Sequence, residues 1–284
     1  MQHSSRRPLT LSLTARRAPD SFGIDPFYND FIAGMEDRLR EVGGSALLRM
    51  ADDVDEELAD YRRWSSDGRI DGVVIVDFVT DDPRVRLVTE LGLPAVLLGG
   101  EPSSSLPTID VDNARAMSDA IAYLATLGHR RIGRVGGPPD LLHTRARADA
   151  FAAALAEHGV TGRTVGGGYT AETGSEGTRT LLADAEPPTA IVYDNAVSAA
   201  AGVQTAQDLG FTVPDDLSLL AWDDSAVCQL SEPPLSVMDR DVRSLGFAAA
   251  SALLDVIDGR VVTTVRAPDA VVVERGTTTP PRAS

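Results

Sequence analysis

Short apolar runs alternate with amphipathic stretches along almost the whole chain. In the amphipathic stretches apolar residues recur at helical spacing, as in Met117, Ile121 and Leu124. The apolar runs are continuous rather than alternating, as expected of parallel strands that are covered on both faces. Such runs predict strands at Leu9–Leu13, Ala46–Met50, Gly72–Phe78, Pro94–Leu98, Arg131–Gly136, Ala190–Tyr193 and Leu217–Trp222. This alternation predicts an α/β protein, and because the units are too many for one sheet, we expect two doubly wound parallel-sheet lobes.

Composition narrows the classes of function. Of the 284 residues 43% are hydrophobic, which is enough for two lobes with their own cores. The formal net charge is -16, so DNA phosphates would repel the chain as a whole. The basic residues Arg6, Arg7, Arg16 and Arg17 are expected to form a solvated tail or linker near the start of the chain.

Cysteine usage and hydropathy bear on the compartment. Cys228 is the only cysteine, so no intrachain disulfide can form, which favours a reducing compartment such as the cytoplasm. No apolar run reaches the ~20 residues that span a bilayer, so no membrane contact is expected. A secretory signal is not visible either.

The stretch Gly210–Asp241 combines several local signals. Gly210 can adopt the left-handed conformation that ends a helix, and Pro214 prevents the helix from resuming. A predicted buried strand, Leu217–Trp222, follows. Asp223 and Asp224 come directly after it, at the carboxyl end of the strand, where open α/β sheets bind their ligands.

This order of residues closely resembles the effector-binding core of the LacI family of transcription regulators. The matching residues are Gly210, Val213, Pro214, Asp216, Ser218, Trp222, Asp223, Asp224, Pro233, Pro234, Leu235 and Ser236. The segment Gly128–Ile132 is similar to the start of the second lobe in that family. The resemblance implies two lobes of the type I periplasmic-binding-protein kind, joined by crossover strands. The expected lobes are 8–127 plus 240–268 and 128–239 plus 269–278, with a basic tail at 1–7 and a flexible tail at 279–284.

The residues Asp25 and Pro26 favour a helix start, because Asp is a good N-cap and Pro a good first helical residue. A helix start alone would explain them. The resemblance implies more, since the family has a similar Asn/Asp-Pro-aromatic segment whose aromatic ring packs on the sugar. We therefore expect Asp25 and Phe27 at the ligand site.

Two further candidates follow from the resemblance. Arg147 matches an arginine that reaches sugar hydroxyls in the family, with Arg145 as the solvated alternative. Asn195 matches an asparagine that binds the ligand, although it could equally be a helix N-cap. Ala196 stands where the family has a carboxylate, which leaves open whether Asp194 takes over that role.

The resemblance implies that Asp223 faces the ligand, and a carboxylate there could accept strong hydrogen bonds from neighbouring hydroxyls. Asp224 is expected to act as a capping or interface residue. Weaker candidates are Phe78, which ends the third predicted strand, and Tyr169, which follows the apolar run Val165–Gly168. Trp222, which could equally be a core residue, and Arg240, near a crossing between the lobes, are weaker candidates of the same kind.

No pattern points to catalysis. The glycines at 166–168 lack the rest of a phosphate loop, and no Gly-x-Ser-x-Gly elbow is present. The four histidines have neither metal-binding spacing nor a cysteine partner. We therefore expect no enzyme activity, no metal and no other cofactor.

The combined expectation is the ligand-sensing and dimerisation core of a LacI-type regulator or repressor. A small-molecule effector, a sugar or sugar derivative, would bind in a cleft between the lobes. Too few residues precede Leu9 for a helix-turn-helix, so a homodimer would contact operator DNA only through a domain absent from this chain. The alternatives are a stand-alone periplasmic-type sugar-binding protein of a transport system and an α/β hydrolase acting on sugar phosphates or nucleosides.

Overall fold

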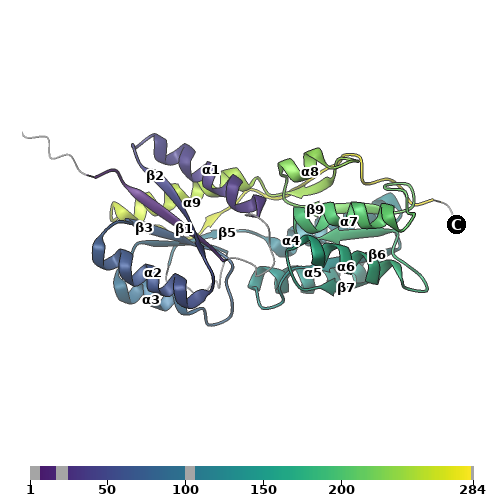
Figure 1. The fold of residues 1–284 in the computed structure, drawn as a ribbon, viewed down its shortest axis with the longest axis horizontal. Coiled ribbons are helices and arrows are strands. Elements are labelled where there is room, and N and C mark those ends of the chain that lie inside the picture. Colours follow the sequence, from purple (N-terminus) through teal and green to yellow (C-terminus); the bar gives the residue numbers. More distant parts are fainter. Residues whose placement is uncertain (1–6, 17–24, 100–105, 283–284) are drawn as a thin grey trace, which may run out of the picture. The chain divides into compact units, whose positions relative to one another are not determined.

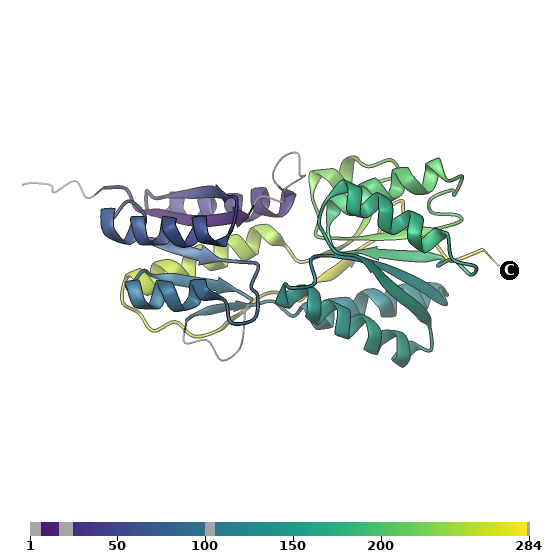
Figure 2. The ribbon, with the colours of Figure 1, turned by 60° about the horizontal axis from the view of Figure 1, so that its bottom comes forward.

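The computed structural model describes residues 7–16, 25–99 and 106–282, which divide into two compact units. The first unit comprises residues 7–16, 28–99, 106–111 and 243–267. The second comprises 25–27, 112–242 and 268–282. Each unit is a β-sheet with helices packed against it (Figures 1 and 2).

The first unit is built on a six-stranded sheet of order β11-β5-β4-β3-β1-β2, in which the paired strands run parallel. Its strands are β1 (Thr10–Arg16), β2 (Ser45–Ala51), β3 (Gly72–Ile75), β4 (Ala95–Leu98), β5 (Thr108–Asp110) and β11 (Val265–Arg266). Its helices are α1 (Pro26–Arg40), α2 (Val54–Asp67), α3 (Pro83–Leu91) and α9 (Val242–Ile257). A Cβ on Gly246 of α9 would lie 2.0 Å from the Phe31 carbonyl oxygen of α1, so a glycine lets these two helices touch backbone to backbone.

The second unit has a six-stranded sheet of order β12-β10-β9-β8-β6-β7, parallel except for β12. Its strands are β6 (Arg131–Gly136), β7 (Thr161–Gly166), β8 (Ala190–Tyr193), β9 (Ser218–Trp222), β10 (Ser236–Asp239) and β12 (Val271–Val273). Its helices are α4 (Asn113–Leu127), α5 (Leu142–His158), α6 (Ala171–Leu182), α7 (Ala196–Asp208) and α8 (Ala226–Leu230). One apolar core lies between the sheet and helices α4 and α5, and another lies under α6 and α7.

The predicted fold class, two lobes with parallel sheets and flanking helices, is confirmed. Each predicted strand overlaps an observed one, and β6 and β8 have the predicted bounds. Strand β7 begins at Thr161, four residues before the apolar run that starts at Val165. Its first four residues are exposed and contain no apolar side chain, so they give no strand signal in the sequence. Strands β5, β10, β11 and β12 were not among the predicted strands. Of these, β5, β11 and β12 have only two or three residues, which are too few to show a pattern, and β10 has four.

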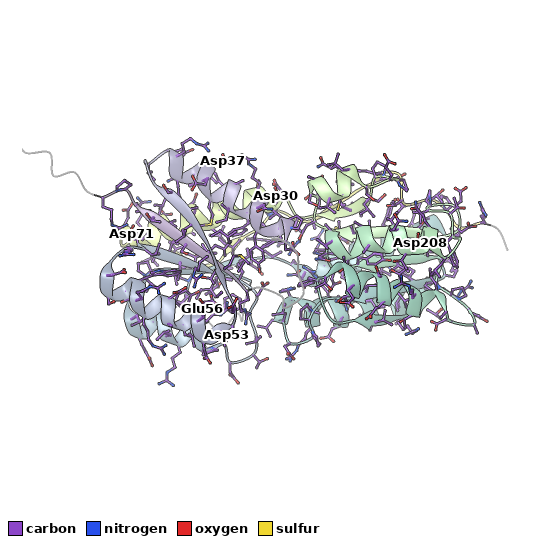
Figure 3. The ribbon with its side chains drawn as sticks, in the orientation of Figure 1. Asp30, Asp37, Asp53, Glu56, Asp71 and Asp208 are labelled. Carbon is purple, nitrogen blue, oxygen red and sulfur yellow. The ribbon has the colours of Figure 1, made fainter. Side chains whose placement is uncertain are left out.

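Helix ends follow the local signals. At the start of α2 the Asp53 side chain accepts the Glu56 N–H at 2.9 Å, as an N-cap does (Figure 3). Asp25 accepts the Phe27 N–H at 2.9 Å before α1, as expected of an N-cap. Gly210 has a φ of 87°, the left-handed conformation predicted for the end of α7.

The boundaries of the units differ from those expected. Residues 25–27 were expected in the first lobe but belong to the second unit. Helix α4 was expected in the first lobe, but its buried residues, such as Ile121, pack with α5 in the second unit. The chain returns to the first unit after Val242 and to the second unit after Ala267, whereas these crossings were expected at 240 and 269. The expected flexible tail is held as far as Arg282, which pairs with Asp215 at 3.2 Å. Residues 1–6 and 283–284, which make up most of the predicted basic tail and the end of the chain, lie outside the described residues.

A buried ion pair joins β6 to the turn that follows β8. Arg134 Nε donates to Asp194 Oδ1 at 2.9 Å, and the Asp194 carboxylate also accepts the Gly137 N–H at 3.1 Å. Both side chains are 1% exposed. A charge at this depth is tolerated only when it is paired and hydrogen-bonded. Asp194 is therefore occupied inside the second unit, which answers the question that the sequence left open about its role.

His129 connects Thr279, near the end of the described chain, with Thr189, the residue before β8. Its Nε2 lies 3.0 Å from the Thr279 carbonyl oxygen and its Nδ1 lies 2.9 Å from Thr189 Oγ1. Because a carbonyl only accepts, Nε2 carries the proton of the neutral ring. The imidazole is buried, and burial lowers the pKa of His129 below its ordinary value of 6.5.

Replacing Arg134 by Met should destabilise the protein by about 3–5 kcal/mol, because Asp194 would keep a buried charge without a partner. Urea unfolding followed by circular dichroism would measure this loss. Arg145→Met is the matched control, since Arg145 is exposed and should change stability by less than about 0.5 kcal/mol. A loss below about 1 kcal/mol for Arg134→Met would contradict a structural role for the pair.

Stability should fall as the pH drops from 7.5 to 5.5 because of His129. The lowered pKa means that the unfolded chain takes up a proton before the folded one, so acid favours unfolding below the ordinary value of 6.5. The slope from this one group is at most about 1.4 kcal/mol per pH unit. Urea unfolding at several pH values should show a shallower dependence for His129→Gln than for the wild-type protein. Equal slopes would disprove the assignment.

Candidate ligand-binding site

Polar side chains gather at the carboxyl edge of the second sheet. Because β6, β8, β9 and β10 run parallel, the residues that follow them meet at this edge. Chain order reverses between β6 and β8, the position where α/β sheets bind ligands. The contacting side chains found there form what we call the edge cluster: Asp25, Phe27, Asn113, Arg147, Tyr169, Asn195, Asp223 and Arg240.

Arg147 of α5 lies at the centre of the edge cluster. Its Nε donates to Asn113 Oδ1 at 2.9 Å and its Nη1 donates to the Asp194 carbonyl oxygen at 3.1 Å. The guanidinium carbon lies 4.3 Å from the centre of the Trp222 ring. Burial, then the nearby charge of Arg240, lower the pKa of Arg147, although an arginine stays protonated in proteins.

The remaining edge of Arg147 can serve a ligand. The described residues offer no hydrogen-bond acceptor to its Nη2 atom, although the side chain is only 3% exposed. The bonds to Asn113 and Asp194 and the stack on Trp222 hold the planar group in place. Arg147 is therefore a preorganised donor, and the neighbouring Arg145 is exposed, as the sequence predicted for the alternative.

Asp223 does not present a free carboxylate. Arg240 Nε and Nη2 donate to its two oxygens, each at 2.6 Å, in a bidentate pair. The Arg240 guanidinium carbon lies 5.9 Å from the centre of the Phe27 ring, and its Nη1 lies 3.4 Å from Asn113 Oδ1. Asp223 has a φ of 64°, a conformation that non-glycine residues seldom adopt. The pair thus orients Asp223, Phe27 and Asn113 together.

Asn195 connects three parts of the second unit. Its Nδ2 donates to Asp25 Oδ2 and to the Tyr169 carbonyl oxygen, both at 2.9 Å. Its Oδ1 accepts the Ser198 N–H at 3.0 Å at the start of α7. The N-cap alternative weighed for Asn195 is therefore present in the structure, together with bonds to two other predicted site residues.

The Tyr169 side chain is held by α5. Its hydroxyl lies 2.7 Å from His143 Nε2 and 3.1 Å from Thr144 Oγ1, and the Tyr169 and His143 rings are nearly parallel at 7°. A Cβ on Gly137 would lie 2.2 Å from the Tyr169 ring, so only a glycine there leaves room for it. These contacts fix where Tyr169 lies beside Asn195.

The structure thus brings together all the predicted site residues except Phe78. Phe78 belongs to the first unit, where it is 4% exposed and lies 5.4 Å from the Arg84 guanidinium carbon. Asn113 was not predicted as a site residue because α4 was assigned to the other lobe. Its position at the start of α4, shortly after the end of β5 and next to the N-cap Asp112, is a local signal that could have identified it. The pairing of Arg240 with Asp223 carries no sequence signal, since sixteen intervening residues separate them.

The edge cluster combines oriented hydrogen-bond donors with carboxylate acceptors and an aromatic ring. Such a set suits a polyhydroxyl compound, whose hydroxyls donate and accept and whose C–H faces pack on aromatic rings. Asp224 lies apart from it and pairs with Arg275 at 2.6 Å. Within the described ranges no group of three His, Cys, Asp or Glu side chains could hold a metal ion. No helix of the described chain is long and apolar enough to cross a membrane.

Comparisons with known proteins agree on one family. Residues 121–278 match the family described as a periplasmic binding protein-like domain. The transcriptional regulator AglR of Rhizobium meliloti is 31% identical over 249 residues, which are 83% of this chain and 69% of AglR. A crystal structure of a LacI family transcriptional regulator from Bifidobacterium animalis is 34% identical, with a TM-score of 0.86 over 96% of this chain and 98% of that one.

A complex of the transcriptional regulator CelR with cellobiose is also similar, at 26% identity and a TM-score of 0.85, covering 96% of this chain and 85% of that one. All three of these proteins are transcription regulators. The match to the family covers residues of both units. It contains five residues of the edge cluster: Arg147, Tyr169, Asn195, Asp223 and Arg240. The chain therefore belongs to the LacI family of transcription regulators and contains the periplasmic-binding-protein-like core that senses the effector in that family.

Proposed function

We propose that this core binds a carbohydrate effector at the edge cluster and thereby regulates transcription. The observation that carries the proposal is Arg147, a buried guanidinium with one donor edge unused among the described residues, beside the oriented carboxylate of Asp223. The binding of cellobiose by the related CelR supports a sugar as the class of ligand. Asp25, Phe27, Tyr169 and Asn195 would complete the contacts, and Phe78 stays a prediction for the first unit.

The effector can regulate only if it binds one conformation of the protein more tightly than another. Arg240 offers a local reason for such a preference, because it lies three residues before the return to the first unit at Arg243. A ligand hydroxyl that hydrogen-bonds to Asp223 would compete with the bidentate pair and change the setting of Arg240. The change in conformation would alter the affinity for operator DNA in the cytoplasm, where operators lie.

The site is tested by calorimetry with a panel of glucose, maltose, cellobiose and sorbitol. Arg147→Lys and Asp223→Asn should each weaken the binding of the tightest ligand about 10- to 100-fold, the cost of losing a hydrogen bond to a charged group. Lysine keeps the charge of Arg147 but loses its planar fork. Arg145→Lys, on the same helix, should leave affinity unchanged. Unaltered binding in both site variants would rule out the edge cluster as the ligand site.

We also propose that the chain forms a homodimer, as expected of a regulator whose operators have two half-sites. Light scattering coupled to size exclusion should give twice the 30.0 kDa of one chain. The mass should stay constant as the protein is diluted. A mass of one chain at every concentration would contradict the dimer and leave the ligand site unaffected.

A further inference from the structure

A cavity of about 150 Å³ opens at the amino end of strands β6 and β7 in the second unit. Its walls come from the first residues of these two strands, from the end of α6 and from the segment between α6 and β8. A cavity of this size holds a molecule as large as benzene in other proteins. The edge cluster lies at the carboxyl ends of the strands, so this cavity is a separate place in the second unit.

The floor of the cavity is apolar. A Cβ on Gly133 of β6 would lie 2.7 Å from Leu181 Cδ1 and 3.3 Å from Pro188 Cγ, so the glycine lets these two buried side chains pack on the strand. Gly133 pairs in register with Arg163 of β7, and Arg131 stands two residues before it. Residues in register or two apart share a face of the sheet, so both arginines lie on the same face as the apolar floor.

Arg131 is anchored but not neutralised. Its Nε donates to the Pro187 carbonyl oxygen at 2.9 Å, and no described residue accepts a hydrogen bond from its Nη1 or Nη2. Arg163 differs, because its Nε and Nη2 donate to the two carboxylate oxygens of Asp184 at 2.9 and 2.7 Å. Arg131 is half-buried and therefore offers two oriented donors at the cavity, an arrangement that suits a carboxylate.

Glu186 brings a negative charge to the same cavity. It precedes Pro187, to which Arg131 is bonded, yet Glu186 and Arg131 form no ion pair in the described part of the chain. A cation and an anion thus line one cavity without neutralising each other. A ligand that carries both a carboxylate and an ammonium group would pair with both, whereas a ligand with one charge would pair with only one of them. An α-amino acid has this combination of groups.

We infer that this cavity binds an α-amino acid with a small apolar side chain. Arg131 binds the carboxylate, Glu186 binds the ammonium group, and the side chain covers Leu181 and Pro188. Burial of that side chain adds the hydrophobic contribution to binding. The inference goes beyond the proposed function, because it assigns a second ligand of another chemical class to a different end of the sheet.

The test is titration calorimetry of the whole chain with leucine and valine. The tighter amino acid is compared with the matching acid that lacks the amino group and the matching amine that lacks the carboxylate. The amine should bind about 10- to 100-fold more weakly, since it loses hydrogen bonds to a half-buried charge. The acid should bind about 3- to 5-fold more weakly, because Glu186 is exposed. No binding of either amino acid, or equal binding of all three compounds, would overturn the inference.

Glu186→Gln should weaken the binding of the amino acid about 3- to 5-fold and leave the affinity for the matching acid unchanged, because the acid has no ammonium group. Glu186 is exposed, so the fold should persist, and the melting temperature would verify this. Glu176→Gln is the matched control, since Glu176 is exposed on α6 and does not line the cavity. An equal loss for the acid and the amino acid in Glu186→Gln would contradict the assignment. The carbohydrate titrations are independent of these results, so the inference can fail while the proposed function stands.

Discussion

The edge cluster depends on the buried ion pair between Arg134 and Asp194. Arg134 fixes the turn after β8, and that turn supplies the Asp194 carbonyl oxygen for Arg147 and the Asn195 side chain for Asp25 and Tyr169. A buried carboxylate without a partner would be too costly, so the pair leaves the turn only one stable setting. The positions of the edge-cluster side chains therefore depend on a buried pair that is not itself part of the cluster.

In the first unit, too, a buried arginine fixes the main chain beyond a strand. Arg84 is buried, pairs with Glu57 and Asp82, and donates to the carbonyl oxygen of Asp77. In both units a buried guanidinium fixes the main chain just beyond a central parallel strand. The net charge of -16 therefore does not describe the interior, where the buried arginines Arg84 and Arg134 hold the main chain and the carboxylates around them in place. Each is offset locally by carboxylates or by backbone carbonyls, as burial requires.

Much of the architecture was predictable because its causes are local. Continuous apolar runs identified the longer strands, and Asp25, Asp53 and Gly210 marked helix ends through their own side chains or conformations. The unit boundary was not predictable in this way. Whether α4 packs on one sheet or the other depends on apolar surfaces far away in the sequence, such as that of α5.

The sequence by itself determined the strand and helix order, the placing of polar residues after parallel strands, and the resemblance to a family of regulators. These depend on periodicity and on motifs of adjacent residues. Only the tertiary structure decided which charged side chains form pairs: Arg240 pairs with Asp223, and Arg134 pairs with Asp194. It also decided that Phe78 is buried beside Arg84. The physical reason is that a charged side chain is placed by the nearest available counter-charge in space. That partner lies 60 residues away for Asp194 and 17 for Asp223, where no sequence pattern links them.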